Sequence, residues 1–472
     1  MTGSGAMLRI GMHTEGARLM HKTAISLLFA CLANSAYADW TAEWRGVWQH
    51  PEPMHSPSSV DVARSATGQV LAALGVGHHG INHAALARFA ADGTFDWLRE
   101  AVSGETIGMA ALGDGSRAAI VDGSGADGAR IQVRAYDVAS GDLAWSDATR
   151  VGRFDGGAHR TATASNGDLL VRASDGGDIV VLRYSADGTP LSDWRWSSGQ
   201  ALASADDILA LPDGGAMVSG RGAAIGGGYL TVRFAANGAV VFTDREDGEL
   251  GNPLGSPRLA AVSDGIVVAG APESRFGVFK AQAWKLSADG ARAWTHALPN
   301  PAGDFGSLDI TGIATRDDDV FVALAGDPAD GFRLVRLDGA DGAVLRDAQG
   351  DVGGVPTTLV QATNGRLLVG GFDFIDSSGH VGARIAEFDA EGAPCRASAN
   401  LGLHGGVAAA GDGDGWLTLG TSEWIDGIGS DALVARYDAD GPCNRGETIF
   451  ANGFDATPAG APQRAPQRDV AL

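Results

Sequence analysis

Histidines gather in a few short segments of this chain, and one segment holds three of them. The stretch GVGHHGINHAA carries His78, His79 and His83. Imidazole nitrogens bind transition metals and exchange protons near neutral pH, and carboxylates complete such sites. The sequence therefore yields candidates for a metal or acid/base site, which are His55, His78, His79, His83, His380, His404, Asp373 and Asp426.

The spacing of these residues does not by itself define a reaction. His79 and His83 are four apart, as on a helix face, but Gly80 lies between them and favours a loop. Solvated loop histidines are the alternative interpretation. Patterns for a serine or cysteine nucleophile or a phosphate-binding loop are missing from the sequence, so we favour a non-enzymatic protein without a cofactor.

A repeated phrase shows which elements must position these side chains. ARYDADG at 435–441 has seven upstream variants, including ARFAADG, LRYSADG and VRFAANG. The last glycines of the eight copies are 47 to 52 residues apart, at Gly93, Gly141, Gly188, Gly238, Gly290, Gly342, Gly392 and Gly441. A fixed period of this length is typical of repeat folds built from one supersecondary unit.

Each unit is expected to hold four short strands. A second turn lies upstream of the repeated one, as in SNGD and PDGG, and the sixth unit departs with RDDD at 316–319. Apolar runs such as DLLVRA and GIVVAG lie between the turns. Asn-Gly and Asp-Gly suit hairpin turns, and four strands in about fifty residues match one propeller blade. The sequence thus predicts an all-β, eight-bladed β-propeller of four-stranded antiparallel blades.

The chain ends should close this ring together. The eighth unit lacks its last strand, while DWTAEWRGVWQH at 39–50 supplies a segment of the right kind. We expect the N-terminal segment to be the outermost strand of the last blade, which removes the open edges of the sheet. The rival arrangement is a ring of seven blades with an extra module.

The N-terminus has the character of an export signal. A short basic segment is followed by TAISLLFACLANSAYA, which ends in Ala36-Tyr37-Ala38. We expect residues 1–38 to be a signal peptide, with 1–19 as an over-extended start, 39–455 to be the propeller, and 456–472 to be a disordered tail. The protein would be periplasmic or extracellular; the alternative is an outer-membrane lipoprotein acylated at Cys31.

Composition limits the partners. The formal charge is −22, which argues against nucleic acid, and the chain lacks a further stretch that is apolar enough for a transmembrane helix. Two cysteines follow the signal segment. In an oxidising compartment Cys395 and Cys443 could form one disulfide, and two buried thiols are the alternative.

Two recurrent features are better explained by structure than by ligands. Asp-rich turns fall short of the calcium-loop pattern, and turn chemistry explains them. The arginines before the aromatic residue of the phrase recur all around the ring, so we expect each to pack between blades and pair with an aspartate; they are Arg88, Arg183, Arg233, Arg336 and Arg436.

The repeats resemble two known groups. RFAADG, RYSADG, RFAANG and RYDADG resemble the delta-60 repeat of secreted bacterial proteins, although the period here is shorter. AYDVASGDLAW at 135–145 is similar to the tryptophan-docking repeat of quinoprotein-like eight-bladed propellers. The adjacent paired cysteines of the quinoprotein enzymes are missing here, so this likeness implies eight blades without quinone chemistry.

The sequence therefore predicts a binding or scaffold module whose partner is a protein or glycan. In a propeller the tight turns share one face and the variable loops share the other, where function is expected. The alternative is a metal-assisted hydrolase or lyase that uses the His and acidic residues of the loop face.

Overall fold

The computed structural model describes most of the propeller. The described residues are 42–48, 56–65, 67–78, 81–101, 105–124, 130–152, 161–197, 204–222, 228–247, 254–275, 278–299, 309–325, 332–350, 354–374, 381–398, 403–413, 415–422, 432–438 and 443. The predicted boundaries at residues 38 and 455 lie outside them. Within these ranges the chain contains no helix that is long and apolar enough to cross a membrane.

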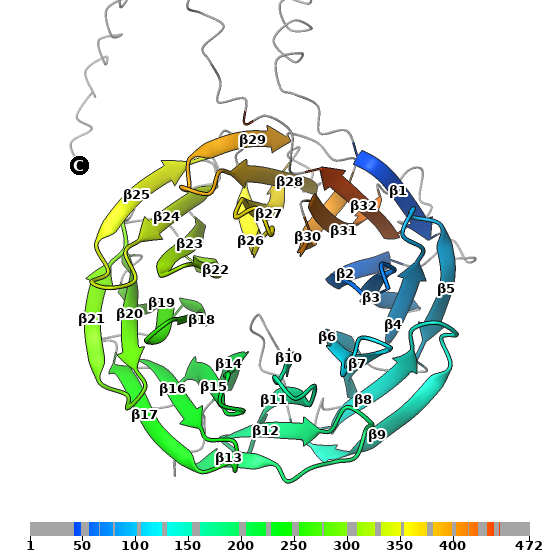
Figure 1. The fold of residues 1–472 in the computed structure, drawn as a ribbon, viewed down its shortest axis with the longest axis horizontal. Coiled ribbons are helices and arrows are strands. Elements are labelled where there is room, and N and C mark those ends of the chain that lie inside the picture. The colour runs from blue at the N-terminus through cyan, green and yellow to red at the C-terminus, as the bar shows by residue number, and fades with distance from the viewer. Residues whose placement is uncertain are drawn as a thin grey trace, which may run out of the picture.

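Eight four-stranded antiparallel blades are arranged in a ring (Figure 1). The innermost strands are β2 (Ser56–Arg64), β6 (Glu105–Leu112), β10 (Thr161–Thr163), β14 (Ser204–Ala210), β18 (Leu254–Val262), β22 (Asp309–Arg316), β26 (Val355–Gln361) and β30 (Leu403–Asp412). The second strands are β3 (Val70–His78), β7 (Arg117–Ser124), β11 (Leu169–Asp175), β15 (Ala216–Arg221), β19 (Gly265–Arg275), β23 (Asp319–Ala325), β27 (Leu367–Phe374) and β31 (Gly415–Ser422).

The outer half of each blade completes the sheet. The third strands are β4 (Ile81–Phe89), β8 (Arg130–Asp137), β12 (Asp178–Tyr184), β16 (Gly228–Phe234), β20 (Val278–Ser287), β24 (Arg333–Leu337), β28 (Val381–Phe388) and β32 (Ala432–Asp438). The outermost strands are β5 (Phe95–Glu100), β9 (Leu143–Val151), β13 (Trp194–Ser197), β17 (Val240–Asp247), β21 (Arg292–Ala297), β25 (Val344–Gln349), β29 (Pro394–Ser398) and, for the eighth blade, β1 (Ala42–Trp48). The predicted fold and blade number are confirmed.

The ring closes through the N-terminal strand, as predicted. Strand β1 pairs antiparallel with β32, with Trp48 opposite Ala432. Blades 7 and 8 additionally share one sheet, because Gly382 of β28 pairs with His404 of β30. The last two blades are thus joined by backbone pairing as well as by side chains.

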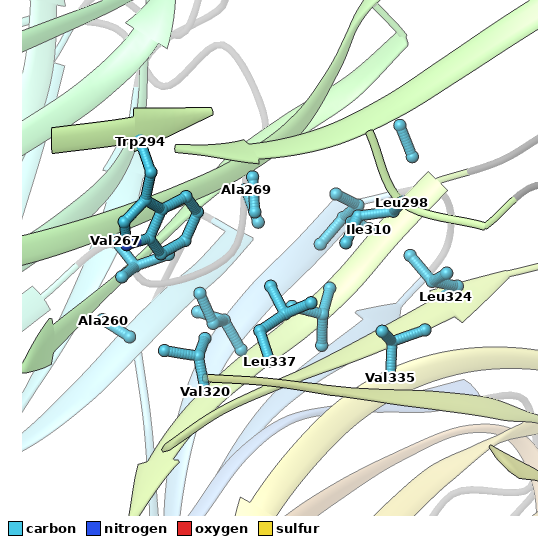
Figure 2. Packing of buried hydrophobic residues seen from close by; sticks show 14 residues of the cluster. Ala260, Val267, Ala269, Trp294, Leu298, Ile310, Val320, Leu324, Val335 and Leu337 are labelled. Atoms are coloured by element: carbon cyan, nitrogen blue, oxygen red, sulfur yellow. The ribbon is translucent and has the colours of Figure 1, made fainter. Parts of the chain in front are cut away.

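The hydrophobic core is divided among the blade boundaries. Each of eight apolar clusters lies between two adjacent blades. Figure 2 shows the cluster between blades 5 and 6, where Trp294 and Ala260 of blade 5 lie with Ile310 and Leu337 of blade 6. Both faces of a blade are therefore buried, which explains why the apolar runs do not alternate with polar residues.

The repeated glycine has two structural reasons. Gly141 has a φ of +73°, in the left-handed region, and a Cβ there would lie 2.9 Å from the ring of Trp97 in the preceding blade. Trp145, Trp194, Phe242 and Trp294 meet the turn glycine of the following blade in the same way. The aromatic of one blade and the glycine of the next therefore form a single packing contact.

The sixth unit departs from the glycine pattern as its sequence indicated. Its first turn lacks glycine, and Asp317 has a φ of +54°, the one positive φ among described residues other than glycine. Aspartate tolerates this conformation better than most residues because its short side chain bonds locally.

Candidate loop-face site

The direction of the strands defines two faces of the ring. The connections between first and second strands, and between third and fourth, lie on one face, which we call the turn face. The remaining connections lie on the opposite loop face. In blade 1, Arg64 and Phe89 end their strands at the turn face, whereas His78 and Glu100 end theirs at the loop face.

Acidic side chains of the turn face are held by the turns themselves. Asp92 Oδ1 accepts from the amide of Thr94 at 3.0 Å, and Asp213 Oδ1 accepts from Gly215 at 2.9 Å. These backbone hydrogen bonds lower the pKa of both carboxyls. The predicted explanation of the Asp-rich motifs by turn chemistry is confirmed at these positions.

The recurrent arginines also have structural partners, as predicted. The separations from guanidinium nitrogen to carboxylate oxygen are 3.5 Å for Arg88–Asp96, 3.4 Å for Arg183–Asp168, 2.7 Å for Arg233–Asp213, 2.9 Å for Arg336–Asp319 and 2.7 Å for Arg436–Asp412. Arg88 also donates to the carbonyl of Ala139 in the next blade at 2.9 Å. The turn face therefore uses its repeated residues to connect blades.

One predicted histidine of the loop face, His83, pairs with a glutamate. His83 Nδ1 is 2.8 Å from Glu100 Oε1, and the two side chains are 19% and 30% exposed. His83 lies near the start of β4 and Glu100 at the end of β5, so both approach the loop face of blade 1. A carboxylate in this position orients the imidazole, as in both acid/base and metal sites.

The backbone register places two further candidates in one row. Gly382 pairs with Asp373 on one side and with His404 on the other. His404 lies opposite Thr421 in blade 8. Asp373 and His404 are therefore separated by a single strand at the loop-face end of the sheet shared by blades 7 and 8.

Four candidates lie within strands and not in loops as the sequence suggested. The hairpin of β3 and β4 extends to the pair His78–Ile81, so His78 and His83 are strand residues. Asp373 is likewise within β27, and His404 follows the first residue of β30. The reason is that backbone pairing continues beyond the apolar part of each hairpin. His55, His79, His380 and Asp426 lie outside the described residues.

The described residues do not gather into a metal site. No group of three or more His, Cys, Asp or Glu side chains within them could hold a metal ion. The pair of His83 and Glu100 is the part of the candidate site in which a contact between side chains is described. Glu100 was missed by sequence reasoning, although its position at the end of an outermost strand, seven residues after Gly93, could have indicated it.

Cys395 and Cys443 are joined by a disulfide in the structure. Their Cα atoms are 4.7 Å apart and their separation in sequence is 48 residues. Cys395 lies on β29, and Cys443 follows the repeated phrase ARYDADG in the sequence. The bond therefore connects the last two blades covalently.

These features define a closed eight-bladed β-propeller, and comparison with known proteins supports this class. No family model matches the chain, and no curated protein matches it. The Dos1 propeller superposes with a TM-score of 0.53 and 11% identity, over 84% of this chain and 96% of that one. Dihydro-heme d1 dehydrogenase NirN aligns with a TM-score of 0.48 and 13% identity, over 86% and 81%. At 11% identity the likeness to the Dos1 propeller shows the fold alone.

Proposed function

We propose that the chain is an exported binding or scaffold module that holds a protein or glycan ligand on its loop face. The proposal rests on a difference between the two faces of the ring. Repeated residues of the turn face are engaged in turns and contacts between blades. Loop-face connections, by contrast, vary from residues 79–80 in blade 1 to residues 423–431 in blade 8. A rigid frame with variable connections on one face is a common arrangement for recognition.

Two observations support export. The N-terminal segment has the order of a signal peptide, with a basic start, a short apolar core and small residues before Asp39. The disulfide between Cys395 and Cys443 suits an oxidising compartment. Fractionation of the native host, followed by mass spectrometry of the mature N-terminus, tests the location. A cytosolic chain that begins before residue 38 would contradict it.

The binding role is tested by a matched pair of variants. The purified chain is applied to glycan and peptide arrays, and each saturable ligand is measured by calorimetry. Residues 125–129 of the loop face are then replaced by a Gly-Ser linker of equal length. The control replaces Asp114 and Ser116 of the turn face by alanine. Variants of other loop-face connections complete the series.

We expect at least one loop-face variant to lose at least tenfold in affinity and the turn-face control to retain it. Loss of binding in the turn-face control alone would place the ligand on the turn face and contradict the proposal. Turnover of a bound ligand would contradict a purely binding role.

The alternative is a metal-assisted hydrolase or lyase on the same face. The observation that favours it is the pair of His83 and Glu100, since a carboxylate-held imidazole is suited to metal or proton chemistry. Metal analysis of the exported protein, with His83→Ala and Glu100→Gln beside the wild type, tests this alternative. Stoichiometric metal that both variants lose would support it, whereas metal below stoichiometry in the wild type would reject it.

A further inference from the structure

A buried arginine lies on the innermost strand of blade 5. Arg258 is 9% exposed and belongs to β18, opposite Ala269 of β19. The pairing of β18 is interrupted between Leu254 and Arg258, and Gly255 within the interruption has a φ of +63°. Such a bulge re-aims the side chains that follow it. Arg258 Nε donates to the carbonyl of Ile310 on β22 at 3.2 Å, so the side chain extends toward blade 6.

The guanidinium of Arg258 is not compensated. Its Nη1 is buried and has no hydrogen-bond partner among the described residues, and no described carboxylate lies within ion-pair distance of the side chain. Burial of a cation is costly unless it is paired, and a guanidinium has five N–H donors to satisfy. One hydrogen bond to a carbonyl leaves most of these donors without a described acceptor. It also leaves the positive charge without a described anion.

Other buried charged side chains lie near β18, and one of them is in an ion pair. Asp206 of β14 is fully buried and accepts from Arg221 Nε at 2.9 Å. Arg172 of β11 is fully buried and donates to the carbonyl of Ala205. Asp207 Oδ2 accepts from the amide of Leu259 at 2.8 Å. The charges of Arg221 and Arg172 both act on Asp206, whereas no described carboxylate lies within ion-pair distance of Arg258.

The surroundings of Arg258 are apolar, so its charge is more costly to leave without a counterion than it would be in water. Ala260, two residues further along β18, belongs to the cluster between blades 5 and 6, together with Ile310 and Ala269 (Figure 2). Since alternate residues of a strand share a face, Arg258 lies at the edge of the same cluster. Electrostatic attraction is stronger there than in water because the local dielectric constant is low.

We propose that Arg258 is the anchor of a binding site for a carboxylate anion at the inner end of the boundary between blades 5 and 6. The Nε is already engaged, so Nη1 and Nη2 are the donors left for a ligand, and two parallel N–H groups match a planar carboxylate. One excess positive charge is balanced by one carboxylate. This site is separate from the loop face and does not depend on the function proposed above.

The experiment measures thermal unfolding of the full chain with sodium acetate, sodium succinate or sodium chloride at equal ionic strength. A hexapeptide with a free or an amidated C-terminus distinguishes a free acid from a peptide terminus as the source of the carboxylate. Binding to the folded state should raise Tm by about 1–2 °C for each tenfold increase in carboxylate above its Kd. Chloride and the amidated peptide should not produce this dependence.

Two variants and a control assign the effect to the proposed residue. Arg258→Met should remove the carboxylate-dependent shift and be as stable as the wild type without ligand, because it replaces an uncompensated charge by an apolar side chain. Arg258→Lys should retain a smaller shift. Arg195→Met is the control, since Arg195 is 48% exposed and pairs with Asp175 and Asp178 on the outer part of blade 3. The proposal is wrong if chloride matches acetate, or if Arg258→Met responds as the wild type does.

Discussion

Cys395 and Cys443 form at the boundary of blades 7 and 8 the contact that Trp97 and Gly141 form at the boundary of blades 1 and 2. Trp97 and Cys395 each lie on an outermost strand, a few residues after the repeated glycine of their blade. Gly141 ends the repeated turn of the following blade, and in the sequence Cys443 lies two residues after Gly441, the equivalent glycine of the repeated phrase. A covalent bond thus takes the place of aromatic packing at the boundary between blades 7 and 8.

This relationship predicts a large effect of removing the disulfide. The variant with Cys395→Ser and Cys443→Ser should lose about 2–4 kcal/mol in the free energy of unfolding, because the bond closes a long loop in the unfolded chain. Chemical denaturation of the oxidised wild type and the double variant measures this loss. Reduction of the wild type should reproduce it, and equal stability of all three samples would contradict the role of the bond.

The packing of aromatic rings on turn glycines predicts a difference between two glycine substitutions. Gly141→Ala should be destabilised by positive φ and by contact with the Trp97 ring and the Arg99 guanidinium. Gly176→Ala meets no atom within 4 Å and has only the strain of its φ of +61°. We expect Gly141→Ala to lose at least about 1 kcal/mol more than Gly176→Ala. Denaturant titration of both variants measures the difference.

Trp97→Ala provides the reciprocal test. Trp97 is 9% exposed, and its truncation should cost about 3–5 kcal/mol. In that background the penalty of Gly141→Ala should shrink toward that of Gly176→Ala, because the ring is gone. If Gly141→Ala costs as much stability in the Trp97→Ala background as in the wild type, contact with the ring is not the reason for glycine at this position.

The frame could be predicted from the sequence because its chemistry repeats. The period of Gly93, Gly141 and the six later glycines gave the number of blades, and the recurrence of the arginines in every blade indicated a structural role. Repetition of this kind separates structural residues from functional ones even in a single sequence.

The candidate site was only partly predictable, since its residues do not repeat. His83 was named from its neighbours, but its partner Glu100 comes from another strand, and a sequence does not show which residues a hairpin register brings together. Arg258 was missed for the same reason. The residue that follows the bulge in the innermost strand is Asp207 in blade 4 and Gly312 in blade 6, so no pattern marks the position.

A buried carboxyl in blade 2 predicts a pH dependence of stability. Asp122 is fully buried and pairs with Arg134, while its Oδ1 has no partner among the described residues. Burial raises the pKa of Asp122 from 3.8 to about 6. Between these values the folded state binds more protons than the unfolded state, so this group makes stability fall as pH rises from about 4 to 6.

We expect Asp122→Asn to remove this contribution, which is on the order of 1–3 kcal/mol above pH 6. Denaturant unfolding from pH 4 to 8 measures the difference between variant and wild type. Asp142→Asn, at an exposed turn position, controls for the loss of one negative charge. A difference between Asp122→Asn and wild type that does not change across pH 4–6 would contradict the raised pKa.

Closure of the ring by β1 predicts that the strand can be supplied separately. Deletion of Ala42–Trp48 and the residues before it leaves the edge of β32 unpaired and removes the buried side chain of Trp48. Exposed sheet edges promote association, so the truncated chain should elute as larger species and unfold at a lower temperature than the intact mature chain. Addition of a synthetic peptide with the sequence AEWRGVW should restore the elution volume of the intact mature chain and raise the Tm of the truncated chain.

A control peptide in which Trp48 is replaced by alanine should do so only weakly, because it cannot fill the apolar cluster between blades 8 and 1. If both peptides act equally, or neither acts, β1 does not close the ring through these contacts.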